Sequence, residues 1–305
     1  MSHVKNTTFR MKTIPGVRLI LFLFILSSHK FIEAQDSIIR IQKDVLYVRG
    51  GTQEQQMDIY LPVGKNFPVV LYLHGGSLTS GDKSDSPYAT IAINFAKNGI
   101  GFILVNYRLG PTAKWPAMAV DAASAFSWIK KNVAILNANP RKLFIVGHSS
   151  GALIASLLST DEKYLQKSGC SLSDIAGCVA MGTMLNPSYD TDSISKDTLN
   201  KIWRKLRTHE TYESLFETPD SYRDADPSRH ITKNAPPFLI LIAEEEQVNP
   251  PILEQANRFT TAMKNVGVQV QIEVLKNRKH STAMNKMAEL NDPTFVKIIE
   301  FIETH

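Results

Sequence analysis

The chain has 305 residues, of which 43% are hydrophobic and 21% charged, and this ordinary globular composition shows no internal repeat that would indicate an array. The formal net charge is +5, but residues 1–34 hold five basic side chains and a single acidic one and account for +4 of it. The remaining chain carries only +1 and has no basic patch, which argues against nucleic acid as a partner.

The basic residues near the start belong to a pattern that is typical of a secretory signal. Lys12 and Arg18 precede the apolar block "LILFLFIL", whose 8 residues are too short to span a bilayer of roughly 30 Å as a helix. We expect residues 1–34 to be a signal peptide, cleaved after Ala34, and the mature chain to be secreted or periplasmic without a membrane span. An uncleaved N-terminal anchor is the alternative.

Strand-like and helix-like segments follow one another along the mature chain. Residues 38–48 and 54–62 alternate apolar and polar side chains and predict an antiparallel pair at a sheet edge. Further strands are expected at residues 68–76, 101–109, 142–149, 175–182, 236–243 and 268–276, and helices at 88–98, 116–132, after 149, at 251–266 and at 293–304. This order predicts βαβ units and therefore an α/β fold with a mostly parallel, doubly wound sheet.

One stretch, from about residue 185 to 235, interrupts this order because it contains no clear core strand. Such a long connection within a compact domain is usually functional or a small subdomain. We expect residues 35–305 to form one domain, with this insertion as a small helical cap over the edge where open α/β sheets bind ligands. Its aromatic side chains either line a pocket or pack within the cap, and they are Trp203, Tyr212 and Phe216.

The segment "GHSSG" at residues 147–151 stands between an expected strand and an Ala/Leu-rich stretch that predicts a buried helix. The pattern G-x-S-x-G is weak by itself, since the serine can be merely a small residue at a tight turn. Between a strand and a helix, however, it predicts a nucleophile elbow that exposes the hydroxyl of Ser149. A serine hydroxyl is a poor nucleophile alone, so this hypothesis requires a base and an acid that orients it.

The base and the acid are expected on loops at the carboxyl edge of the sheet. Among the eight histidines, His280 comes shortly after the last expected strand, which places it on a loop within reach of Ser149. The loop after the preceding strand offers three acids in a row, Glu244, Glu245 and Glu246. An acidic run is normally a solvated turn, and residue types alone do not choose among the three.

The segment "LHGGS" directly follows the strand expected at residues 68–76, and its glycines would let backbone N–H groups approach a substrate closely. We expect the amides of Gly76 and Ser77, together with that of Ser150 after the nucleophile, to form an oxyanion hole. A glycine turn without such a task is the alternative for this segment.

Together these segments resemble the α/β-hydrolase superfamily, in particular its carboxylesterase branch with hormone-sensitive-lipase-like and feruloyl-esterase-like enzymes. The resemblance is carried by "MDIYLP", "VVLYLHGGS", "VNYRLGPTAKWPA", "VDAASAFSWIKKN", "NPRKLFIVGHSSGA", "APPFLILIA" and "RKH". It implies the α/β-hydrolase fold, Ser149 as nucleophile, His280 as base, and no metal or organic cofactor. It also implies an acid three residues after the position of Ala243, which is Glu246, with Glu245 second. The family usually has aspartate there, and HGGG in place of HGGS.

We therefore expect a serine esterase that acts on small-molecule short-chain or aromatic carboxylic esters through an acyl-enzyme. An amidase of the formamidase type and a non-catalytic binding protein on the same fold are the alternatives. The sequence does not indicate an oligomeric state.

The only cysteines are Cys170 and Cys178, which either form a small disulfide or belong to the core. They do not suggest zinc, because no histidine lies near them.

Overall fold

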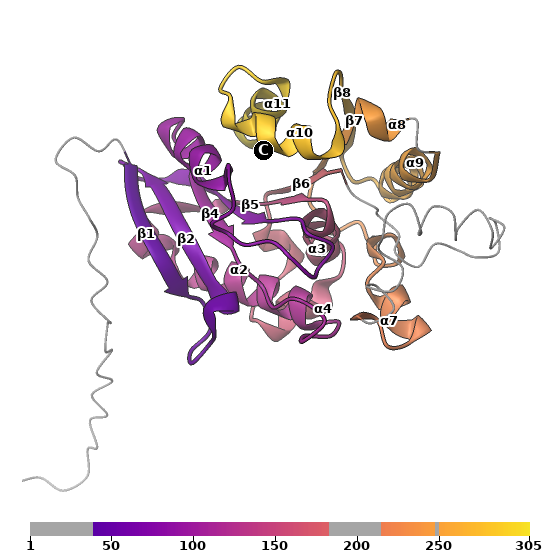
Figure 1. Cartoon of the computed structure of the whole chain (residues 1–305), viewed down its shortest axis with the longest axis horizontal. Helices are drawn as coiled ribbons and strands as arrows, with labels where there is room; N and C mark the ends of the chain where they lie inside the picture. Colours follow the sequence, from indigo (N-terminus) through magenta and orange to yellow (C-terminus); the bar gives the residue numbers. More distant parts are fainter. Residues whose placement is uncertain (1–38, 183–214, 248–249) are drawn as a thin grey trace, which may run out of the picture. The chain divides into compact units, whose positions relative to one another are not determined.

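The computed structural model describes residues 39–182, 215–247 and 250–305, and its centre is an 8-stranded sheet (Figure 1). The strands are β1 Ile39–Leu46, β2 Gln56–Pro62, β3 Phe67–Leu73, β4 Gly101–Val105, β5 Ala138–His148, β6 Gly177–Met181, β7 Phe238–Ala243 and β8 Val270–Leu275. Their order across the sheet is β1-β2-β4-β3-β5-β6-β7-β8. Every strand expected from the sequence is present.

Most of the sheet is parallel. Strand β2 runs antiparallel to both β1 and β4, whereas β4, β3, β5, β6, β7 and β8 pair in parallel. Figure 1 shows the antiparallel pair β1 and β2 at one end of the sheet. The predicted doubly wound α/β sheet with an antiparallel N-terminal edge is thus confirmed.

Helices cover both faces of the sheet. They are α1 Tyr88–Lys97, α2 Ala117–Leu136, α3 Ser150–Leu158, α4 Glu162–Lys167, α7 Pro219–Asp224, α8 Glu244–Gln247, α9 Pro250–Asn265, α10 His280–Asn285 and α11 Pro293–Thr304, with 3-10 turns η1 Gln53–Gln55, η2 Leu172–Asp174, η3 Pro227–Arg229 and η4 Lys286–Ala288. Side chains of α2, α3, α4 and α9 belong to one apolar cluster, and those of α1, α10 and α11 to another. Because successive strand residues point to opposite faces, Val69 and Leu71 of β3 join the first cluster while Val70 and Tyr72 join the second.

The parallel pairing brings five strand ends together. Strands β3, β5, β6, β7 and β8 are consecutive neighbours with the same direction, so the loops that follow them emerge at one edge of the sheet. The chain winds from β3 to β4 on one side and continues with β5 on the other, which makes the crevice between β3 and β5 a topological switch point. The sequence places "HGGS" directly after β3 and "GHSSG" across the end of β5.

The predicted cap lies largely outside the described residues, which resume at Leu215. The carbonyl of Leu215 accepts a hydrogen bond of 3.1 Å from the Trp115 amide, and the Trp115 indole N–H donates to Asp224 at 3.0 Å. Phe216 is buried, with its ring centroid 5.3 Å from that of Trp115 and 4.5 Å from that of Tyr222. Of the three aromatic residues singled out in the sequence, Phe216 therefore packs internally, and the other two lie outside the described residues.

Cys170 and Cys178 are both buried free thiols, which decides against the disulfide. Burial raises the pKa of the Cys178 thiol to about 12, as expected for a core residue of β6.

No helix in the described ranges is long and apolar enough to cross a bilayer. The signal predicted at residues 1–34 lies outside these ranges and stays a prediction.

Candidate active site

Ser149 occupies the turn between β5 and α3, in a backbone conformation that side-chain-bearing residues rarely adopt (φ 56°, ψ −123°). Two glycines make this turn possible. A Cβ added to Gly147 would lie 2.3 Å from the Gly151 carbonyl oxygen, and one added to Gly151 would lie 2.2 Å from the Leu73 carbonyl oxygen. Both glycines of "GHSSG" are thus required by close backbone contact, as in the predicted nucleophile elbow.

A hydrogen-bonded chain of three side chains starts at this serine. His280 Nε2 lies 3.0 Å from Ser149 Oγ, and His280 Nδ1 lies 2.6 Å from Glu246 Oε1. An ionised carboxylate only accepts hydrogen bonds, so Nδ1 carries the ring proton and donates it to Glu246. In that tautomer Nε2 is unprotonated and accepts a hydrogen bond from the serine hydroxyl.

The structure singles out Glu246 among the three consecutive glutamates. Its side chain is 4% exposed, and its second oxygen accepts a hydrogen bond of 2.8 Å from the Ala243 amide. Glu244 and Glu245 are exposed. Two of the three were expected to be solvated, as Glu244 and Glu245 are, although the run forms the short helix α8 rather than a turn, with Glu246 held against the end of β7.

The segment that carries His280 is also tied to α8. The Glu244 carboxylate accepts a hydrogen bond of 2.8 Å from the Asn277 amide, and the Glu245 amide donates to the Arg278 carbonyl at 3.1 Å. Arg278 in turn forms an ion pair with the buried Asp292. The sequence placed His280 on a loop, whereas the structure makes it the first residue of α10, so its backbone is held by a helix as well.

A second histidine, His148, supports the first. The His148 side chain is 6% exposed, its Nε2 lies 3.0 Å from the His280 carbonyl oxygen, and the two rings are 4.8 Å apart. A carbonyl oxygen only accepts, so Nε2 of His148 donates this bond. Burial, and then the neighbouring His280, lower the pKa of His148 to about 4. His148 was seen in the sequence only as part of the elbow, because a contact with a residue so distant in the chain leaves no sequence signal.

The predicted oxyanion residues lie where the ends of β3 and β5 meet. Gly76 and Ser77 follow β3, and Ser150 is the first residue of α3. Within the described part of the chain, the backbone N–H groups of these three residues donate to no other protein group. They are therefore available to a ligand oxygen, as an oxyanion hole requires.

Gly182, after β6, is a further site residue that the sequence analysis missed. It has φ 55°, and a Cβ at this position would lie 3.0 Å from both Glu246 Oε1 and His280 Nδ1. The signal that pointed to it was present, since a glycine ends the segment "IAGCVAMG" at the edge of the sheet. Its lack of a side chain leaves room for the hydrogen bond between Glu246 and His280.

The described residues include no group of three or more His, Cys, Asp or Glu side chains arranged to hold a metal ion.

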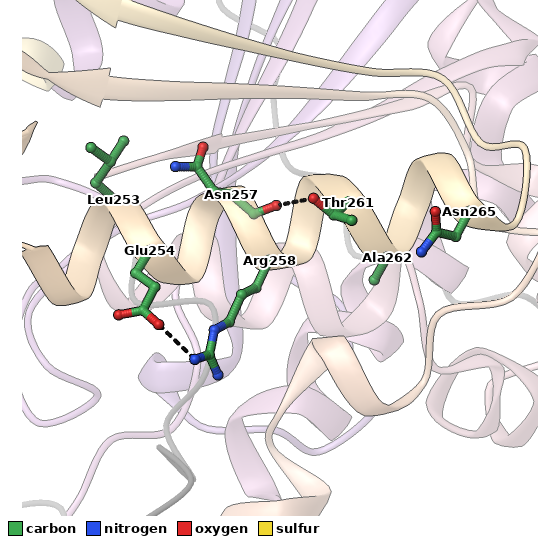
Figure 2. Close-up of a pocket in the computed structure, with 7 residues that line it drawn as sticks. All are labelled: Leu253, Glu254, Asn257, Arg258, Thr261, Ala262 and Asn265. Atoms are coloured by element: carbon green, nitrogen blue, oxygen red, sulfur yellow. Dashed lines mark hydrogen bonds and ion pairs between the residues drawn. The ribbon is translucent and has the colours of Figure 1, made fainter. Parts of the chain in front are cut away.

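A shallow hollow of about 660 Å³ lies along α9 (Figure 2) and is lined by Leu253, Glu254, Asn257, Arg258, Thr261, Ala262 and Asn265. Glu254 and Arg258 pair with each other there at 2.6 Å, and none of the residues at the elbow contributes to it. The candidate site is the elbow, where hydrogen bonds join Ser149, His280 and Glu246.

A mostly parallel sheet with a Ser–His–carboxylate chain at its carboxyl edge defines an α/β-hydrolase with the constellation of a serine hydrolase. Residues 57–263 match the profile of the family described as BD-FAE. The chain therefore belongs to this carboxylesterase family, which confirms the resemblance noted in the sequence.

Individual relatives agree with this assignment. The chain is 28% identical over 247 residues to the esterase LipQ of Mycobacterium tuberculosis, covering 78% of this chain and 56% of LipQ. It is 25% identical to the ethyl acetate hydrolase of Pseudomonas putida, covering 77% and 73% of the two chains. A truncated carbohydrate esterase from gut microbiota has the same fold, with a TM-score of 0.70 at 18% identity over 89% of this chain and 98% of that one. The chain thus spans little more than half of the length of LipQ.

We expect Gly182→Ala to lower kcat for a test ester such as p-nitrophenyl acetate by about tenfold. The added methyl group would lie 3.0 Å from both the carboxylate and the imidazole, so it displaces them by a fraction of an ångström, whereas a full displacement of about 1 Å costs about 100-fold. Gly99→Ala is the matched control, because Gly99 also has a positive φ (79°) but open space around a Cβ. Equal activity of the two variants would contradict this reading of Gly182.

The low pKa of His148 predicts a specific loss of stability in acid. An unfolded histidine titrates near pH 6.5, whereas His148 in the folded protein titrates near 4. Between these values the unfolded state binds the additional proton, so the free energy of unfolding falls as the pH falls. His148→Gln should reduce this loss by up to about 3 kcal/mol at pH 4. Chemical denaturation between pH 7 and 4 measures it, and parallel curves for the two proteins would contradict the prediction.

Proposed function

We propose that the protein is a serine esterase in which Ser149 is the nucleophile, His280 the general base and Glu246 the residue that orients the imidazole. The observation that carries the proposal is the unbroken chain of hydrogen bonds from Glu246 through His280 to Ser149, of 2.6 and 3.0 Å. Each of the three comes from a different strand end, so their meeting is not a consequence of closeness in sequence.

The chemistry follows from the protons already in place. His280 Nε2 accepts the hydroxyl proton as Ser149 Oγ attacks the ester carbonyl, and the imidazolium then protonates the departing alcohol. Water attacks the resulting acyl-enzyme by the same route, with His280 as base, and releases the acid and the free serine. Glu246 keeps Nδ1 protonated throughout and stabilises the imidazolium.

In this mechanism backbone amides stabilise the negative charge that develops on the carbonyl oxygen. We assign its stabilisation to the N–H groups of Gly76, Ser77 and Ser150, which have no other partner among the described residues. Such fixed donors cost no reorganisation at the moment of reaction, and losing one typically lowers the rate about 100- to 1,000-fold.

For the substrate we propose short-chain or aromatic carboxylic esters. The support is the family, together with a relative named ethyl acetate hydrolase and a structural neighbour named a carbohydrate esterase, both of which are named for esterase activity. Amides of the aryl formamide type are the second class to compare, because the same constellation supports both reactions. We further propose that the protein is exported, from the signal predicted at residues 1–34.

The direct test is hydrolysis of p-nitrophenyl esters from acetate to dodecanoate by the chain and by its Ser149→Ala variant. The proposal predicts activity on the shorter esters and a loss of about 10⁶-fold in the variant, as for a removed nucleophile. Full activity of Ser149→Ala would exclude the mechanism. Activity confined to matched aryl formamides would identify an amidase, and a folded protein with neither activity would indicate a binding role.

A pair of neighbouring substitutions tests the identity of the acid. We expect Glu246→Gln to lower kcat by roughly 10³- to 10⁴-fold, because the amide no longer favours the Nδ1–H tautomer of His280. Glu245→Gln makes the same chemical change one residue away on an exposed side chain, and it should leave kcat within about twofold. The opposite ranking in steady-state kinetics would make Glu245 the acid.

A further inference from the structure

The loop that carries the proposed oxyanion donors has an unusual backbone. Two successive residues with side chains, Ser77 (φ 55°) and Leu78 (φ 62°), follow Gly76 (φ 121°) in the left-handed region. Residues with a Cβ occupy this region at an energetic cost, and such a conformation persists only where the surroundings hold it. The contacts of the loop therefore show what keeps its amides in place.

Some of these contacts lie within the loop. The Gly76 carbonyl accepts hydrogen bonds of 3.0 Å from the amides of Thr79 and Ser80, which close a tight turn. These bonds fix the shape of the loop, but they do not fix its position relative to Ser149.

The contacts that fix its position converge on Leu78. The amide of Leu78 donates a hydrogen bond of 3.2 Å to the Ser150 hydroxyl oxygen, and its carbonyl accepts one of 2.8 Å from the Gly110 amide. The Leu78 side chain is fully buried. Leu78 follows the proposed donor Ser77 directly, and Ser150 follows the nucleophile directly, so the bond between them joins the two halves of the site by their nearest neighbours.

We propose that the Ser150 side chain is a positioning residue, which fixes the distance between the oxyanion loop and Ser149. This rests on the function proposed above, and it is separate from the part assigned there to the Ser150 amide. Serine hydroxyls near a helix start commonly bond to nearby backbone groups, whereas this one accepts from a residue 72 positions earlier in the chain.

The proposal predicts a characteristic kinetic change. Oxyanion donors act on charge that exists only in the transition state, and they must lie within about 2.7–3.1 Å of the position of that oxygen. A loop that is no longer tied to the elbow should therefore lower kcat and leave KM nearly unchanged. A substitution that only weakened the fold would lower the melting temperature without this selective effect.

Helix α3 offers a matched control in Ser156. This serine is also fully buried, but its hydroxyl has no hydrogen-bond partner among the described residues. Ser156→Ala therefore removes the same atom from the same helix without touching the loop.

The experiment compares kcat, KM and melting temperature of Ser150→Ala and Ser156→Ala on the p-nitrophenyl ester that the chain hydrolyses best. We expect kcat of Ser150→Ala to fall about tenfold with KM within about twofold, since the donors are displaced rather than removed. Ser156→Ala should keep kcat within about twofold. Binding of a trifluoromethyl ketone, which adds to the serine as a tetrahedral adduct, should weaken in Ser150→Ala by the same factor as kcat/KM.

Two further variants complete the test. Ser150→Thr retains the hydroxyl and should recover most of kcat. Ser150→Cys places only a weak hydrogen-bond acceptor in nearly the same volume, so its kcat should fall as in Ser150→Ala, and it replaces the alanine variant if that one does not fold. Equal kcat in Ser150→Ala and Ser156→Ala, or a change in KM alone, would overturn the proposal. An active Ser149→Ala would instead overturn the proposed function, so the two failures are distinguishable.

Discussion

The close contact of three backbone segments around Ser149 is the constraint on which the rest of the site depends. The end of β3, the end of β5 and the start of α3 approach so closely that neither Gly147 nor Gly151 has space for a Cβ. The backbone around Ser149 is therefore restricted to the conformation of the elbow. With the elbow formed, the loop after β3 lies beside Ser149, and the Ser149 hydroxyl contacts His280, which follows β8. Packing of the core on both faces of the sheet supports this contact.

The same hydrogen bonds that hold Glu246, the proposed acid, also orient His280, the proposed base. Glu246 is buried, and a buried carboxylate is costly unless hydrogen bonds replace its water. Its two oxygens accept hydrogen bonds from the Ala243 amide and from Nδ1 of His280. The folded structure therefore favours the Nδ1–H tautomer, whose Nε2 can accept a proton from Ser149. His148 donates a hydrogen bond to the His280 backbone and stays neutral above its low pKa, so it adds no second positive charge beside the imidazolium of the proposed reaction.

Much of this arrangement could be predicted from the sequence, because it depends on local patterns. Runs of β-forming residues predicted the strands, and the glycines on either side of Ser149 indicated a sharp turn. The choice of Glu246 required the resemblance to a family, since three equal residue types stand in a row and only the geometry of α8 distinguishes them. The contacts of Gly182, His148 and the Ser150 hydroxyl could not be predicted, because each joins segments that are distant in the chain and depends on the last few ångströms of packing.

The central claim, that Ser149 is acylated with help from His280, can be tested most directly by trapping the intermediate. The protein is mixed with p-nitrophenyl acetate, quenched in acid within the first turnovers, digested and measured by mass spectrometry. The account predicts an acetyl group on the peptide that contains Ser149, absent from Ser149→Ala and strongly reduced in His280→Ala. Turnover without an adduct on that peptide, or an acetyl group elsewhere in a variant that still hydrolyses the ester, would contradict it.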